Sequence, residues 1–232
     1  MSSVFLNPMK YAVPLAGALL LGACASGPRS PDWQAEAKNS MERSVAAYME
    51  GNTRVEAAEL ARARSHLSRT GRADLLATAE LLHCATRVAS LIFESCAGYE
   101  PLGVDASEAQ RAYADYLQGK LPAQNIALLP LAQRAAAGGD ASSLKAIADP
   151  LSQLVAAGVL LQTGRASPAV IVQAIDTASS QGWRRPLLAW LGVQLRRAQE
   201  GGNVQEADRL RRRIAIAQGD GLGLPQLEKE RR

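Results

Sequence analysis

Apolar residues recur at steps of three to four along most of the chain, and Gly, Asn or Pro interrupts the pattern at intervals. This spacing predicts amphipathic α-helices separated by short turns. The expected helices cover residues 32–50, 53–71, 75–89, 105–119, 122–137, 141–163, 167–181, 184–200 and 203–218. Pro150 is expected to kink or divide segment 141–163, because proline cannot donate the helical hydrogen bond. No convincing run of residues alternates as a strand would, so the predicted fold class is all-α.

Two of the expected helices have a defined core-facing stripe. Thr53 is expected to cap the second helix. The predicted buried stripe of this second helix consists of Val55, Ala58, Ala61 and Leu67. The stripe of the third helix consists of Leu75, Ala79, Leu82 and Ala89. Residues 96–104 contain two glycines and a proline, and we expect them to be irregular.

Two short patterns occur twice in the chain. The pattern Ala-x-Tyr-x-x-Gly stands at 46–51 and 114–119, an offset of 68 residues, which is twice the tetratricopeptide period of about 34. Gly-Asn followed by Glu-Ala occurs at 51–57 and again at 202–207, and Trp190-Leu191-Gly192 is similar to the start of a repeat. Segments 37–70 and 184–218 therefore resemble degenerate tetratricopeptide repeats. The resemblance implies antiparallel helical hairpins in an open array, although a closed helical bundle would explain the same residues.

The N-terminus has the pattern of an export signal. Lys10 is its only charge, and the uncharged run 11–23 is shorter than the roughly 20 residues that span a bilayer. The run ends in Leu21-Gly22-Ala23-Cys24, which resembles the lipobox of bacterial lipoproteins. The resemblance implies cleavage between Ala23 and Cys24 and covalent lipid on Cys24. An ordinary signal peptide with a chance cysteine is the alternative.

These features predict four regions and an address. Residues 1–23 are the lipoprotein signal peptide, 24–31 the lipidated cysteine and tether, 32–218 an all-helical domain, and 219–232 a flexible charged tail. Because Ala25 rather than aspartate follows the cysteine, the resemblance implies the outer membrane, with the protein facing the periplasm.

The two remaining cysteines, Cys84 and Cys96, are expected to form a disulfide in an oxidising compartment. On one continuous helix they would lie about 18 Å apart along the axis, too far for a disulfide. The bond therefore requires the chain to turn back between Leu91 and Ser95. The alternative is a pair of buried free thiols.

The small net charge of the chain argues against a nucleic-acid partner. The formal net charge of +4 falls to +3 once residues 1–23, with Lys10, are removed. From residue 184 to the end, however, 11 basic residues face six acidic ones. The candidate basic surface consists of Arg196, Arg197, Arg209, Arg212 and Arg213. A solvated helix exterior is the simpler interpretation, because consecutive arginines point around a helix.

Candidate catalytic residues are few, and we expect neither a metal site nor a cofactor other than the lipid. His83 precedes Cys84, but adjacent helical residues do not face each other. Glu94-Ser95 resembles the catalytic Glu that is followed by Ser in lytic transglycosylases, yet the Gly-Leu-Met-Gln-like stretch that this family shows downstream is missing. Glu94 and Glu100 are the first carboxylate pair to test, because glycosidases use two carboxyls roughly 5 to 9.5 Å apart.

The expected function is that of a non-catalytic, lipid-anchored helical scaffold that binds another envelope protein or peptide. This is the class that the tetratricopeptide resemblance implies. The alternative is an enzyme, or an accessory subunit, that acts on peptidoglycan or another glycan. A small-ligand binder ranks last, because two Phe, three Trp and five Tyr leave few aromatic side chains to line a pocket.

Overall fold

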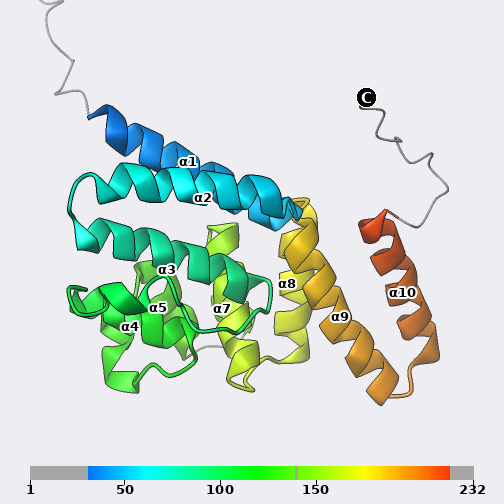
Figure 1. Cartoon of the computed structure of the whole chain (residues 1–232). Helices are drawn as coiled ribbons and strands as arrows, with labels where there is room; N and C mark the ends of the chain where they lie inside the picture. The colour runs from blue at the N-terminus through cyan, green and yellow to red at the C-terminus, as the bar shows by residue number, and fades with distance from the viewer. Residues whose placement is uncertain (1–30, 139–140, 220–232) are drawn as a thin grey trace, which may run out of the picture. The chain divides into compact units, whose positions relative to one another are not determined.

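The computed structural model describes residues 31–138 and 141–219, and these residues form helices and turns without a strand (Figure 1). The all-α prediction is confirmed. The α-helices are α1 (Asp32–Glu50), α2 (Thr53–Ser68), α3 (Ala73–Ala89), α4 (Glu108–Leu117), α5 (Leu131–Ala137), α6 (Ala141–Lys145), α7 (Pro150–Gln162), α8 (Pro168–Ser180), α9 (Arg184–Glu200) and α10 (Val204–Gln218). The short 3-10 helices are η1 (Glu100–Leu102) and η2 (Ala123–Leu128).

The repeated sequence patterns produce the same local structures. Tyr48 and Tyr116 are both buried near the ends of their helices, α1 and α4. Asn52 caps α2 by accepting a hydrogen bond of 3.2 Å from the Val55 amide. Asn203 caps α10 in the same way. The expectation that Thr53 would be the cap is therefore wrong, because the asparagine one residue earlier satisfies the free amide.

The buried face of α2 also differs from the prediction. Val55 is 41% exposed, and Ala58 and Ala61 lie on the exposed side. Only Leu67 of the predicted stripe is buried. The buried side chains are Glu56, Glu59, Leu60, Ala63 and Leu67. The true stripe includes two carboxylates, which a hydrophobic pattern overlooks.

Prolines divide the middle of the chain. The expected helix 122–137 is instead η2 followed by α5, with Leu129 extended before Pro130. This prediction is wrong, because the proline ring disfavours the helical conformation of the preceding residue. The expected division at Pro150 is present: α6 and α7 are separate helices, and Asp149 caps α7.

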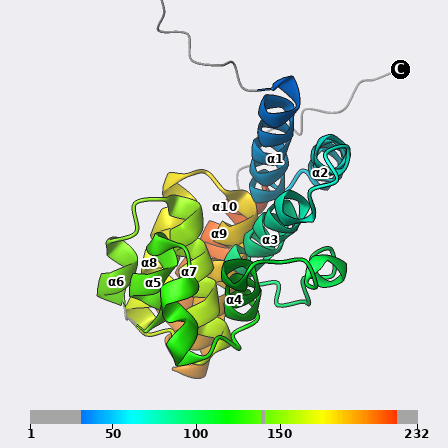
Figure 2. The same ribbon diagram turned by 90° about the vertical axis from the view of Figure 1, so that its left-hand side faces the viewer.

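Helix α3 lies between the α1–α2 hairpin and the later helices, as Figures 1 and 2 show from two directions. It packs against α1 and α2 on one side and against α4 and α7 on the other. Helices α7, α8, α9 and α10 then follow one another, each packed on the next. The two kinds of hollow described below, one charged and one apolar, both lie beside α3.

A glycine allows α7 to approach the end of α3. A Cβ atom at Gly158 would lie 2.4 Å from the main-chain oxygen of Val88. Both helices are lined there by small buried residues, including Ala85, Ala89 and Ala157. Small side chains bring the helix axes together, which increases dispersion contacts in an alanine-rich core.

Residues 1–30, 139–140 and 220–232 lie outside the described part of the chain. The predicted signal peptide, the cleavage site Ala23–Cys24, the tether up to Ser30 and the tail after Gly219 fall in these ranges and stay predictions. Among the described helices, none is both long enough and apolar enough to cross a bilayer.

Candidate functional site

Helix α3 presents three different stripes to its surroundings. Its core stripe contains Ala77, Leu81, Cys84, Ala85 and Val88. A polar stripe, made of Glu80, His83 and Arg87, faces one hollow, and a second stripe, made of Leu75, Thr78 and Leu82, faces another. Each outer stripe repeats at i, i+3 and i+7, the spacing that keeps residues on one helical face. A single helix thus separates a charged cavity from an apolar groove.

The charged cavity lies between α2, α3 and the segment that follows α3, and its volume is about 370 Å³. Three carboxylates, two guanidinium groups and one imidazole line it. These side chains belong to Glu56, Glu80, Glu94, Arg64, Arg87 and His83. Sequence analysis did not identify Glu56, Arg64 or Glu80.

Each carboxylate in the cavity faces a basic side chain. The Arg64 guanidinium donates two hydrogen bonds, of 2.5 and 2.7 Å, to Glu80, whose side chain is 4% exposed. His83 Nε2 lies 3.1 Å from Oε1 of the buried Glu56. A buried carboxylate is stable only when an opposite charge or a hydrogen-bond donor satisfies it. The pairing explains why α2 and α3 tolerate carboxylates in their interface.

Burial favours the neutral form of the histidine in this cavity. Burial lowers the pKa of His83 below its usual value, and the opposing effect of Glu56 is smaller. The neighbouring Cys84 is bonded to Cys96 and is therefore no free nucleophile. Within residues 31–138 and 141–219, no three potential metal-binding side chains form a cluster.

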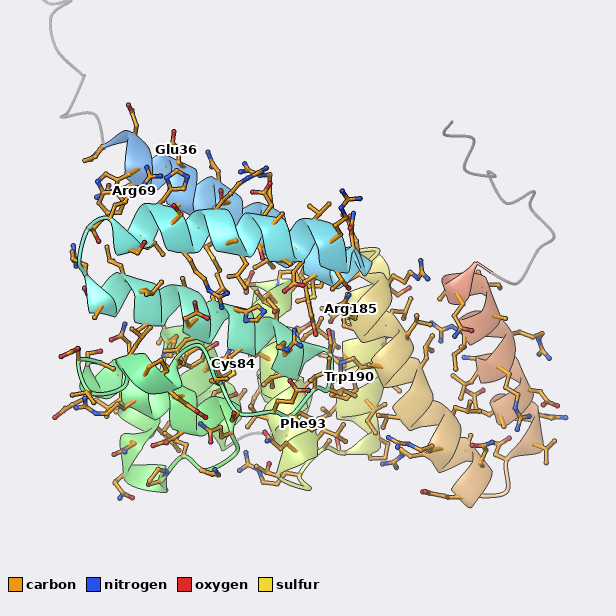
Figure 3. The ribbon with its side chains drawn as sticks, viewed as in Figure 1. Glu36, Arg69, Cys84, Phe93, Arg185 and Trp190 are labelled. Carbon is orange, nitrogen blue, oxygen red and sulfur yellow. A yellow bond between two sulfur atoms is a disulfide. The ribbon has the colours of Figure 1, made fainter. Side chains whose placement is uncertain are left out.

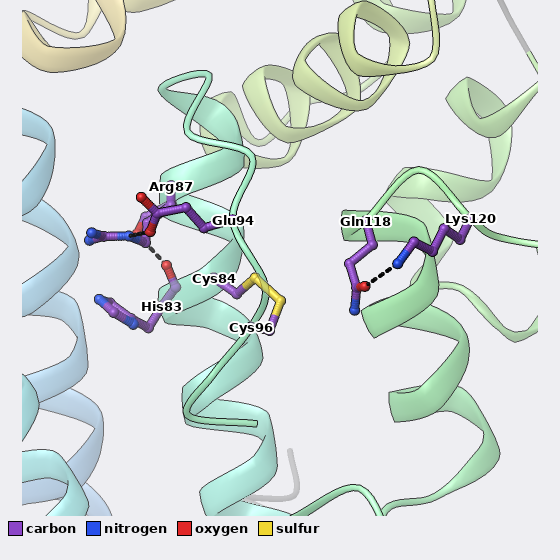
Figure 4. The surroundings of a disulfide bond; sticks show 8 residues. His83, Cys84, Arg87, Glu94, Cys96, Gln118 and Lys120 are labelled. Atoms are coloured by element: carbon purple, nitrogen blue, oxygen red, sulfur yellow. Dashed lines mark hydrogen bonds and ion pairs between the residues drawn. A yellow bond between two sulfur atoms is a disulfide. The ribbon is translucent and has the colours of Figure 1, made fainter. Parts of the chain in front are cut away.

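The predicted disulfide is present, and the Cα atoms of Cys84 and Cys96 are 5.5 Å apart (Figure 4). Helix α3 ends at Ala89, and Leu91 adopts a left-handed conformation with φ of 62°. The amides of Leu91 and Ile92 bond back to the last turn of the helix, as in a Schellman motif. The chain therefore turns back at the start of the predicted region, and Ile92 and residues 94–98 form one wall of the cavity.

The carboxylate pair Glu94–Glu100 does not form one site in the described residues. Glu94 lines the cavity and lies 3.8 Å from Arg87, with 67% of its side chain exposed (Figure 4). Glu100 is exposed in η1 and does not line the cavity. The two carboxylates thus lack the shared cleft that glycoside hydrolysis needs.

On the other side of α3 lie two apolar hollows, of about 460 and 300 Å³. The larger is bounded by α4 and the η2–α5 connection, and the smaller by α1 and the end of α2. Both are lined by Thr78 and Leu82 of α3, so they meet. We call their union the α3 groove. Its apolar lining consists of Trp33, Ala37, Met41, Leu67, Leu75, Ala79, Leu81, Leu82, Ala109, Tyr113, Leu128, Leu129 and Pro130.

One polar side chain fixes the junction of the two hollows. Gln110 donates hydrogen bonds of 2.7 Å to the Asp74 carbonyl and 2.9 Å to the Thr78 hydroxyl. Its own side-chain oxygen accepts from the amide of Ser107, which closes a capping box at the start of α4. The start of α4 is therefore held against α3, and this contact sets the width of the groove.

The candidate basic surface lies on the α9–α10 hairpin. Arg196, Arg197, Arg209 and Arg212 are exposed, and Arg213 is half-buried. Arg209 lies 3.4 Å from Glu206, and the neighbouring Arg211 lies 2.6 Å from Asp208. The two acidic residues of α10 thus neutralise part of the surface.

Comparison of the chain with models of protein families, with curated proteins and with solved structures gives no match. The proposals that follow accordingly rest on the sequence and on the geometry described above.

Proposed function

We propose that the protein is a lipid-anchored, non-catalytic scaffold that binds an apolar segment of another envelope protein in the α3 groove. The observation that carries this proposal is the joining of two apolar hollows along one exposed helical stripe. Leu75 and Leu82, which the sequence pattern assigns to the core, are only partly buried and line this groove. Apolar residues left partly open at a concave surface are typical of peptide-binding grooves.

The spacing along α3 defines the ligand. Leu75 and Leu82 are seven residues apart, about 10 Å along the helix axis. Leu75 lines the smaller hollow and Leu82 lines both, so one apolar side chain over each end of this stripe would occupy the groove. Positions i and i+7 of a helix have this separation on one face, whereas positions i and i+3 of an extended strand point to opposite faces. The partner therefore presents two apolar anchors on one face of a helical segment.

The charged cavity gives less support to an enzyme. Glu56, Glu80 and Glu94 each lie beside a basic side chain, so no carboxylate there is free to act as the second member of an acid–base pair. The ion pairs Arg64–Glu80 and Arg87–Glu94, together with the Glu56–His83 hydrogen bond, explain these residues as stabilising contacts. The scaffold therefore remains our proposal over the peptidoglycan- or glycan-directed alternative.

A photo-cross-linking amino acid at Ala109 tests the groove directly. Ala109 is exposed in the lining of the larger hollow, so a larger residue fits there and leaves the Gln110–Thr78 hydrogen bond in place. We expect illumination of intact cells to yield one discrete cross-linked envelope protein. A Leu82→Arg substitution should abolish this product, because it places a charge in the apolar groove. The purified partner segment should then bind with a Kd that Leu82→Arg raises at least about tenfold, a loss of about 1.4 kcal/mol.

Val172 of α8 provides the matched control. It is 47% exposed and lies outside the groove. A cross-linker at Val172 should not yield the same product, and Val172→Arg should leave the product at Ala109 unchanged. Equal cross-linking from both positions, or a product that survives Leu82→Arg in a folded protein, would remove the groove from the proposal.

The anchor requires its own experiment. Metabolic labelling with a clickable palmitate analogue should label the wild-type chain, and Cys24→Ala should abolish the label. Cys84→Ser provides the control, since we assign no lipid to that residue. Labelling that persists in the Cys24→Ala chain would show that the lipobox resemblance is accidental, without affecting the groove.

A further inference from the structure

Helix α10 is held by a single neighbour. Among the described helices it packs substantially only on α9, along which it runs antiparallel after the Gly201-Gly202 turn (Figure 1). Its inward residues, Ala207 and Leu210, are buried and Ile214 is half-buried. These three positions follow i, i+3 and i+7 and define the face against α9. No described helix packs substantially on the opposite face of α10.

That opposite face carries a cationic stripe. Arg209, Arg212, Arg213 and Ile216 stand at i, i+3, i+4 and i+7, and so lie together on one side of the helix. We call them the α10 stripe. Arg209 has 63% of its side chain exposed, Arg212 is exposed and Ile216 is 57% exposed. Only Arg209 has an acidic partner within the described residues, and this partner is Glu206.

The α9–α10 hairpin carries more basic than acidic side chains. Between residues 184 and 219 there are eight arginines, no lysine and three carboxylates. Two of the three carboxylates, Glu206 and Asp208, are already paired within α10. The guanidinium group binds phosphate oxygens through two parallel hydrogen bonds, which a lysine ammonium cannot do. The hairpin is therefore suited to a surface that carries many phosphates.

We propose that the α10 stripe docks on the anionic phospholipid headgroups of a membrane. The exposed Ile216 within the same stripe favours a bilayer over an acidic protein, because interfacial helices combine basic residues with apolar side chains that enter the headgroup region. The proposal goes beyond binding in the α3 groove. It also stands without the lipid on Cys24, since the stripe itself supplies the attraction.

Vesicle binding by residues 25–232 tests the stripe in the absence of the lipid and the signal segment. The described residues from Asp32 to Gly219 belong to one compact unit, which contains all the buried residues described above. We expect this chain to float with vesicles that contain phosphatidylglycerol and not with vesicles of phosphatidylcholine alone. The triple variant Arg209→Gln, Arg212→Gln, Arg213→Gln should lower the partition coefficient at least about tenfold.

A control with the same change in net charge separates the stripe from the charge of the whole protein. Arg54→Gln, Arg69→Gln, Lys145→Gln removes three exposed cations from α2, the residue after it and α6. It should reduce binding less than about threefold. Far-UV circular dichroism establishes that both triple variants are folded.

Two results would overturn the proposal. The first is failure of the unmodified chain to bind phosphatidylglycerol vesicles at physiological ionic strength. The second is an equal loss of binding in the two triple variants, which would show a response to net charge alone. The single variant Ile216→Ser should weaken binding and leave its dependence on salt unchanged, because it removes the apolar contact only.

Discussion

Trp190 of α9, labelled in Figure 3, donates a hydrogen bond of 3.1 Å from its indole nitrogen to the main-chain oxygen of Ala89, the last residue of α3. The two residues are 101 positions apart in the chain. Trp190 is fully buried, so its N–H group needs this partner. The bond holds the C-terminal helices to the same helix that carries the groove and the cavity.

Two replacements of this indole are expected to destabilise the fold by different amounts. Trp190→Phe should lower the free energy of unfolding by about 1–3 kcal/mol, because it leaves a buried carbonyl without its donor. Trp190→Ala should lower it by about 3–5 kcal/mol through the added cavity. Urea unfolding measures both values. Trp183→Phe, at a half-buried position, is the comparison. If it has the same effect as Trp190→Phe, the hydrogen bond contributes little.

The disulfide should stabilise the protein measurably. Its loop closes 12 positions of sequence, for which loop entropy predicts about 3 kcal/mol. We expect the double variant Cys84→Ser, Cys96→Ser to have a free energy of unfolding lower by about 3 kcal/mol, and so to unfold at a lower urea concentration. Reductant should shift the wild-type transition toward that of the double variant and leave the double variant unchanged. A wild-type transition that is insensitive to complete reduction would contradict the prediction.

Two helical glycines should respond to alanine with opposite signs. At Gly158 the new methyl group would meet the Val88 carbonyl of α3, so Gly158→Ala should destabilise by about 1–3 kcal/mol. Gly192 of α9 has open space around its Cα atom. Gly192→Ala should therefore stabilise by about 0.5–1 kcal/mol through helix propensity. Thermal unfolding distinguishes the two, and a stabilising Gly158→Ala would argue against the close packing of α3 on α7.

Stability should decline below neutral pH because of His83. Burial lowers the pKa of His83 in the folded protein, so the unfolded chain takes up a proton more readily. His83 therefore does not reduce the free energy of unfolding above about pH 6.5. As the pH falls from there toward the lowered pKa, protonation of His83 in the unfolded chain reduces the free energy of unfolding. Unfolding titrations between about pH 7.5 and pH 5 should show the decline, and His83→Gln should flatten it.

Two carboxylates should affect stability at a lower pH than His83 does. The hydrogen bond from Arg43 is the main cause that lowers the pKa of Glu59, and the hydrogen bond from Arg72 does the same for Asp74. Their contribution is present above the ordinary carboxyl range and is lost only at lower pH. If the decline begins at carboxyl pKa values and persists in His83→Gln, the assignment to His83 is wrong.

Local features of the fold were predictable because their signals are local. The limits of α1, the turn after α3 and the disulfide follow from capping residues, glycines and cysteine spacing. The α2 stripe was not predictable from hydrophobicity, since Glu56 and Glu59 occupy positions where apolar residues are expected. Glu56 lies four residues before Leu60, and Glu59 lies four residues before Ala63. This spacing is a usable signal, because carboxylates on a buried stripe imply cationic partners.

The α3 groove was beyond sequence reasoning for a different reason. The helical period identifies Leu75 and Leu82 as apolar positions but cannot say whether another helix covers them. The answer depends on where α1 and α4 lie beside α3, and this placement rests on contacts such as the Gln110–Thr78 hydrogen bond. Tertiary placement decides whether an apolar stripe becomes core or binding surface.

The central position of α3 also has a consequence for the order of folding. The α1–α2 hairpin joins neighbours in sequence, so only a short loop must close before its contacts form. Helix α3 completes its packing only when α7 and the indole of Trp190 arrive from much later in the chain. Such distant contacts slow the search for the native state. Until then, α3 keeps an uncovered apolar surface that a chaperone would recognise.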